Sequence, residues 1–171
     1  MSIVYSSCTK KEAVLQKTYS TRLKQREAVE TKISHLSLSD LLPPDRRLVL
    51  NLGTRTLSLL TDGPALMMEQ QFSGNEMRML VPLLESYPYY CPYEVLLAHI
   101  SSNVVTEASI AHCRQRLQEA LSRGIWQQEL RPIRRALSSL RSKLDRFDLG
   151  ISNVRERGCS LISLTSHRPS R

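Results

Sequence analysis

The chain has few of the features that mark secreted, metal-binding or membrane proteins. Its four cysteines (Cys8, Cys91, Cys113 and Cys159) lie far apart and form no CxxC pair. Because a structural zinc site usually needs close pairs of ligands, we expect small buried thiols in a reducing compartment. No apolar run approaches the roughly 18 residues of a membrane span, and no secretory segment is evident. We therefore expect a cytoplasmic protein with no membrane, metal or cofactor.

Groupings of residues typical of catalysis are also missing. The histidines are scattered, at His35, His99, His112 and His167. His112 and Cys113 are sequence neighbours, so on a helix they point about 100° apart and cannot form a tight dyad. Gly53 and Gly63 have neither the spacing nor the lysine of a phosphate-binding loop. We predict that the protein is not an enzyme and has no catalytic residues.

What the chain does have is positive charge, concentrated toward one end. The formal net charge is +8 over 171 residues. Residues 1–122 hold 13 Lys or Arg against 12 Asp or Glu, whereas residues 123–171 hold 11 against 4, a net of +7. A charge that served only solubility would be spread more evenly. This distribution favours a polyanionic partner, either nucleic acid or an anionic membrane surface.

Proline divides the chain into an extension and a domain. Residues 1–44 are polar with a thin apolar stripe, which predicts a partly helical or disordered extension, with a dimerisation arm as an alternative. Pro43-Pro44-Asp45 ends it. The predicted domain spans residues 45–165, and residues 166–171 form a flexible basic tail.

Short alternating runs open the domain and amphipathic helices follow. The runs 47–52, 57–60 and 65–72, separated by glycine-containing breaks, predict a small antiparallel sheet. Ser73 and Glu76 have the spacing of a capping box and predict the start of a helix. Further helices are expected from about Pro92 or Tyr93, over 106–123 and over 131–146.

The helix expected over 131–146 separates apolar from basic residues. Its leucines and isoleucine fall within about 60° of one another, at Ile133, Leu137, Leu140 and Leu144. The opposite arc carries Arg131, Arg134, Arg135, Ser138, Arg141 and Ser142. Arginine recognises guanine edges and phosphates, and serine permits close approach. An isolated helix of this kind is more often only a solvated basic face, so the next segment matters.

A basic hairpin is predicted directly after this helix, over 151–164. Arg155 and Arg157 lie in its turn, and Gly158 is expected to supply the positive φ that the turn demands. A rigid β-tip that presents arginine suits the minor groove of DNA.

Several of these residues resemble the OmpR/PhoB-type winged helix-turn-helix effector domain of bacterial response regulators. The run 140–144 (LRSKL) is similar to the family's L-R-x-K-L, and Ile151 with 153–158 (NVRERG) resembles its T-V-R-G-x-G wing. Upstream, Phe72-Ser73 with Glu76 stands where the family has L-T-x-x-E. The resemblance covers about residues 47–164. In this chain Glu156 and Cys159 replace the family's glycine and aromatic residue.

The resemblance implies an α+β fold: an N-terminal antiparallel sheet, three core helices plus one inserted helix, and a C-terminal hairpin wing. It implies that helix 131–146 lies in the major groove of double-stranded DNA and that Arg155 reaches the minor groove. It also implies contacts by Ser139. The full expected DNA-binding set is Arg131, Arg134, Arg135, Ser138, Ser139, Arg141, Ser142, Lys143, Arg155 and Arg157. Residues 1–44 are too few for a receiver domain, so we do not expect the family's phosphorylation control.

The sequence thus predicts sequence-specific DNA binding by a bacterial transcription regulator. RNA polymerase and a homodimer on DNA remain open as further partners, since the inserted helix 106–123 lies where the family contacts polymerase. The main alternative is a winged-helix protein-interaction module that acts through this inserted helix, because a fold alone does not fix a function. RNA binding by the basic tail is a smaller alternative.

Overall fold

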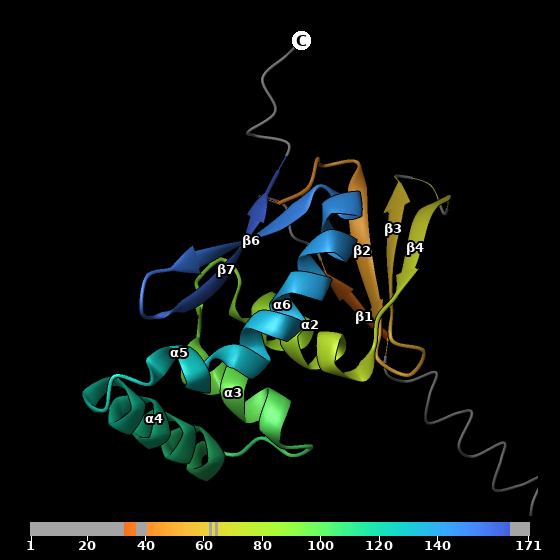
Figure 1. Cartoon of the computed structure of the whole chain (residues 1–171). Helices are drawn as coiled ribbons and strands as arrows, with labels where there is room; N and C mark the ends of the chain where they lie inside the picture. Colours follow the sequence, from red (N-terminus) through yellow and green to blue (C-terminus); the bar gives the residue numbers. More distant parts are fainter. Residues whose placement is uncertain (1–32, 37–40, 62, 64, 165–171) are drawn as a thin grey trace, which may run out of the picture.

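The computed structural model describes residues 33–36, 41–61, 63 and 65–164, which form a mixed α+β fold (Figure 1). Residues 1–32 and 37–40 of the extension predicted over 1–44, and the tail predicted over 166–171, lie outside the described residues. No helix in the described ranges is both long enough and apolar enough to cross a bilayer.

The N-terminal sheet is antiparallel and has four strands in the order β1-β2-β3-β4. Its strands are β1 (Ile33–Leu36), β2 (Arg46–Asn51), β3 (Thr56–Thr61) and β4 (Leu66–Gln71). Alternate residues of β2 and β3 are buried, among them Leu48 and Leu57, as period-two patterning requires. The three predicted runs are confirmed. The interpretation of residues 33–36 as part of a helical or disordered extension is wrong, because β1 pairs with β2.

Four long helices occupy the expected positions: α2 (Gly74–Ser86), α3 (Tyr93–Ser101), α4 (Glu107–Ser122) and α6 (Arg131–Leu144). The capping box of α2 is confirmed, since Glu76 N donates to Ser73 Oγ at 3.3 Å and Ser73 N to Glu76 Oε2 at 2.6 Å. Gly124 has a φ of +71° just after α4, as expected for a helix stop. The short helix α5 (Trp126–Glu129) was not predicted, and the helix predicted over 131–146 ends in the 3-10 turn η1 (Asp145–Phe147).

The C-terminal hairpin consists of β6 (Leu149–Val154) and β7 (Gly158–Ser163), and the two-residue strand β5 (Cys91–Pro92) joins it on the β7 side. The hairpin is confirmed, but the role predicted for Gly158 is wrong. Glu156 takes the left-handed conformation in the turn, with φ +59°. Gly158 instead allows β5 to come close, because a Cβ there would overlap the backbone carbonyl of Cys91.

One cluster of buried apolar side chains joins these elements. It runs from Leu48 and Leu57 of the N-terminal sheet through Leu80 of α2 and Leu140 of α6 to Leu161 of β7. Figure 1 shows α6 between the four-stranded sheet and the β6–β7 hairpin, with α3, α4 and α5 grouped toward its N-terminal end. Helix α6 is therefore held from both flanks and keeps one side toward solvent.

Candidate nucleic-acid interface

Helix α6 is anchored by its apolar stripe. Ile133, Leu137, Leu140 and Leu144 are all at most 2% exposed, as the spacing of three and four residues predicts. Pro132 lies in the first turn, where its missing N–H costs no hydrogen bond. This fixes the rotation of the helix, so the polar side chains divide into three groups according to the neighbour that each faces.

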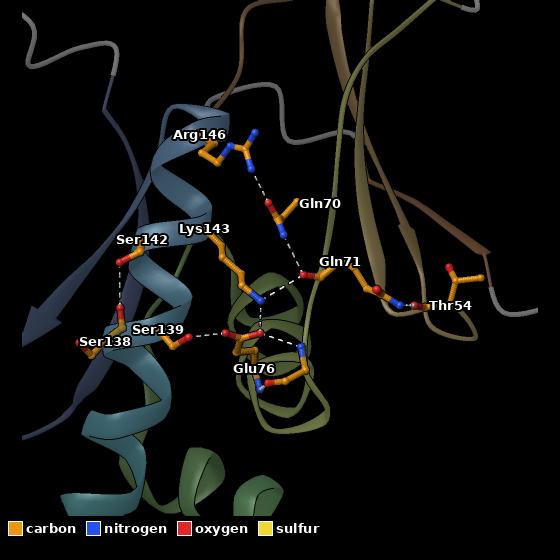
Figure 2. A network of polar contacts seen from close by, with 10 residues as sticks. Thr54, Gln70, Gln71, Glu76, Ser138, Ser139, Ser142, Lys143 and Arg146 are labelled. Atoms are coloured by element: carbon orange, nitrogen blue, oxygen red, sulfur yellow. Dashed lines mark hydrogen bonds and ion pairs between the residues drawn. The ribbon is translucent and has the colours of Figure 1, made fainter.

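The first group faces solvent and consists of Arg131, Arg135, Ser138 and Ser142. Neither Arg131 nor Arg135 makes a side-chain hydrogen bond or ion pair with any residue that the structure describes. Ser142 Oγ donates to the backbone oxygen of Ser138 at 3.5 Å, within the helix (Figure 2). This face can therefore offer two guanidinium groups and two small hydroxyl side chains to a partner.

The second group joins α6 to α5 and to β6. Arg134 donates to the side-chain oxygen of Gln127. Arg141 donates through Nε to Ile151 O at 3.4 Å and through its terminal nitrogen to Asn153 Oδ1 at 2.8 Å. Arg141 thus connects the exposed face of α6 to the hairpin and fixes how the two are placed relative to each other.

The third group turns toward α2 and contacts Glu76. Lys143 Nζ lies 2.7 Å from Glu76 Oε2 and 3.1 Å from the backbone oxygen of Gln71, and Ser139 Oγ donates to Glu76 Oε1 (Figure 2). Lys143 also lies 5.4 Å from the ring centre of Phe72. Ser139 and Lys143 belong to the expected DNA-binding set, and their side chains are used here for contacts within the fold.

Glu76 is ionised in this setting. Its side chain is only 5% exposed. Burial alone would raise the pKa of Glu76, but hydrogen bonds from Lys143, Ser139 and Ser73 outweigh that effect and lower the pKa from 4.5 to about 2. The buried carboxylate therefore caps α2 and neutralises Lys143 at the same time. The sequence predicted only the capping role of Glu76, because its partners Ser139 and Lys143 lie 63 and 67 residues further along the chain.

The hairpin tip is exposed and basic. Arg157 N donates to Val154 O at 3.0 Å, which closes the turn. The side chains of Arg155 and Arg157 make no ion pair or hydrogen bond in the part of the chain that is described, and Glu156 is exposed between them. The tip therefore carries two free positive charges and one negative charge.

Two buried thiols lie in the C-terminal sheet. Cys91 of β5 faces Cys159 of β7 in the strand register. Both are free thiols and both are fully buried. Burial raises the pKa of the Cys91 thiol to about 11 and also raises that of Cys159. Cys159 Sγ lies 3.6 Å from Asn153 Oδ1, the atom that also accepts from Arg141. The expectation of buried thiols is confirmed for Cys91, Cys113 and Cys159, whereas Cys8 lies outside the described residues.

Comparisons with protein-family models, with curated proteins and with solved structures gave no match.

Proposed function

We propose that this protein binds double-stranded DNA in a sequence-specific manner as a transcription regulator of the winged helix-turn-helix type. One observation carries the proposal. The anchored helix α6 exposes Arg131 and Arg135, which have no side-chain partner among the described residues, next to a hairpin that exposes Arg155 and Arg157. Most of the net positive charge of the chain lies in this C-terminal segment.

The arrangement suits a duplex for a geometric reason. The major groove is about 12 Å wide and admits one α-helix, and its neighbouring minor groove attracts arginine where it narrows. Arg141 is bonded to both Ile151 and Asn153, so helix and hairpin are already fixed relative to each other before binding. A preorganised pair loses less conformational entropy on binding than two independently moving elements.

The roles of the arginines differ in this proposal. Arg131 faces solvent on the outward side of α6, where it can meet base edges. Arg155 at the hairpin tip meets the minor groove, and Glu156 beside it weakens that contact by repelling phosphate. Ser139 and Lys143 act indirectly, since their contacts with Glu76 set the orientation of α6.

The test is selection of bound duplexes from a random pool, followed by affinity measurements at several salt concentrations. We expect one enriched motif and a logarithmic affinity that falls linearly with the logarithm of salt concentration, by about 0.9 per phosphate neutralised. Arg131→Ala should relax discrimination at one or two base pairs, at a cost of about 1–3 kcal/mol. Arg123→Ala, at the end of α4, is the matched control and should change neither motif nor salt slope.

The surface of α4 supports a second candidate function, a protein-interaction module. Leu121 is 60% exposed, and a cleft of about 290 Å³ beside it is lined by Trp126 and Tyr93. This candidate predicts weak duplex binding with no enriched motif. If selection with the wild-type protein gave no enriched motif, the interaction module would be favoured over DNA binding.

A further inference from the structure

A cleft of about 520 Å³ runs along α6 on its α2 side. It lies between the first turn of α2, the end of α3 and the first half of α6. Its lining includes Asn75, Ser101, Pro132, Arg135 and Ser139. Arg134 and Arg141 bond toward α5 and β6, so the cleft and the hairpin lie on different flanks of the same helix.

The cleft has one positive charge that nothing in the described fold neutralises. Glu76 also lines it, but Lys143 matches that charge at 2.7 Å. Arg135 makes no ion pair or hydrogen bond with the described residues, and the same holds for the side chains of Asn75 and Ser101. An amide N–H₂ and a hydroxyl can both donate to an oxygen anion. The cleft therefore offers a guanidinium and two neutral donors to one anionic group.

We infer that this cleft binds one backbone phosphate of the duplex, held by Arg135 with Asn75 and Ser101. The inference rests on the proposed function. A helix in the major groove lies between two phosphate backbones, so with the hairpin on one flank the second backbone passes the other flank. Phosphate contacts fix the register of a protein on DNA and carry no sequence information directly. Arg135 then positions the protein, and Arg131 remains the residue that meets base edges.

The experiment uses the full chain and the selected duplex, synthesised as a series in which single phosphates are replaced by uncharged methylphosphonates. We expect one linkage, outside the hairpin contact, whose neutralisation weakens wild-type binding about tenfold, as loss of a charged hydrogen bond would. The same change should weaken binding by Arg135→Ala much less, because only the neutral donors Asn75 and Ser101 remain. That variant should bind selected and scrambled duplexes more weakly by the same factor, and its salt slope should be smaller by about 0.9.

Two further variants separate the cleft from general effects. Asn75→Ala combined with Ser101→Ala should reduce the response to the same linkage, whereas Ser122→Ala on the exposed side of α4 should respond like the wild type. The replaced side chains are all exposed, so each variant should unfold at the same thermal midpoint as the wild type.

Several results would overturn the inference while leaving DNA binding in place. One is relaxed discrimination at a single base pair in Arg135→Ala; another is an identical response of that variant and the wild type to every linkage. Binding of inorganic phosphate that depends on Arg135, with a flat response to the linkages, would make the occupant a free anion. A wild-type protein that binds no duplex would overturn the proposed function itself.

Discussion

Glu76 shows how one side chain serves two purposes at the scale of a single residue. It accepts the backbone N–H of Ser73 and so completes the cap of α2, and it accepts from Lys143 and Ser139 of α6. Removing one partner of a buried, hydrogen-bonded charge leaves the other charge unpaired, which is more costly than losing an exposed pair. We therefore expect Glu76 to stabilise the packing of α6 against α2 strongly.

The pH dependence of stability tests this role of Glu76. Its folded-state pKa of about 2 lies below the ordinary value of 4.5, so its stabilisation is complete above pH 4.5 and is lost as the pH falls toward 2. Between pH 6 and pH 3 we expect wild type to lose about 2 kcal/mol more free energy of unfolding than Glu76→Gln. Urea unfolding at both pH values measures this difference. Glu119→Gln on exposed α4 is the control, and equal pH dependence in wild type and Glu76→Gln would contradict the assignment.

At the scale of elements, the hairpin depends on a close approach that its own turn does not reveal. Gly158 lies against the backbone of Cys91, so β7 and β5 can pair only if this position has no side chain. Glu156 adopts the left-handed backbone conformation in the turn. This conformation usually costs a residue with a Cβ about 1–2 kcal/mol. A glycine at position 156 would adopt this conformation without strain.

Two substitutions in the hairpin should therefore have opposite effects. Gly158→Ala should lower the free energy of unfolding by about 3 kcal/mol, since β5 and β7 must move apart. Glu156→Gly should raise it by up to about 1 kcal/mol, because the left-handed strain is relieved. Chemical denaturation of both variants provides the measurement. If Glu156→Gly were the more destabilising change, our assignment of the two positions would be wrong.

At the scale of the whole molecule, the two sheets and the helices share one hydrophobic core. Leu57 of β3 and Leu140 of α6 belong to the same buried cluster. The contacts of Lys143 with Gln71 and Glu76 add polar links from α6 to the end of β4 and to α2. The single tryptophan, Trp126, lies on α5 with its ring 6.1 Å from that of Tyr93 in an edge arrangement. Its fluorescence therefore reports on the helical end of the fold.

A substitution in the N-terminal sheet should therefore shift the unfolding transition that Trp126 fluorescence measures. Leu57→Ala should lower the free energy of unfolding by about 2–5 kcal/mol, with Trp126 fluorescence and far-ultraviolet circular dichroism shifting together, as expected for one cooperative unit. Leu66→Ala in the neighbouring strand is a matched control, because Leu66 is 55% exposed and should cost less than about 0.5 kcal/mol. Separate transitions for the two signals would show that sheet and helices unfold independently.

By itself the sequence determined the local elements of this protein. Patterns that depend on neighbours a few residues away predicted β2, β3, the capping box of α2, the stop after α4 and the buried stripe of α6. It also placed the excess positive charge at α6 and the hairpin. These patterns can be interpreted from the sequence alone because backbone geometry repeats every two residues in a strand and about every 3.6 residues in a helix.

Only the tertiary structure decided how these elements use their polar and small residues. Ser139 and Lys143 bond to Glu76 across 63 and 67 residues of sequence, and β5 joins β7 from a distant part of the chain. The strand β1 likewise forms by pairing with β2, although the sequence predicted a helical or disordered extension there. These contacts form only when elements that are distant in the sequence pack together, so local sequence periodicity cannot predict them.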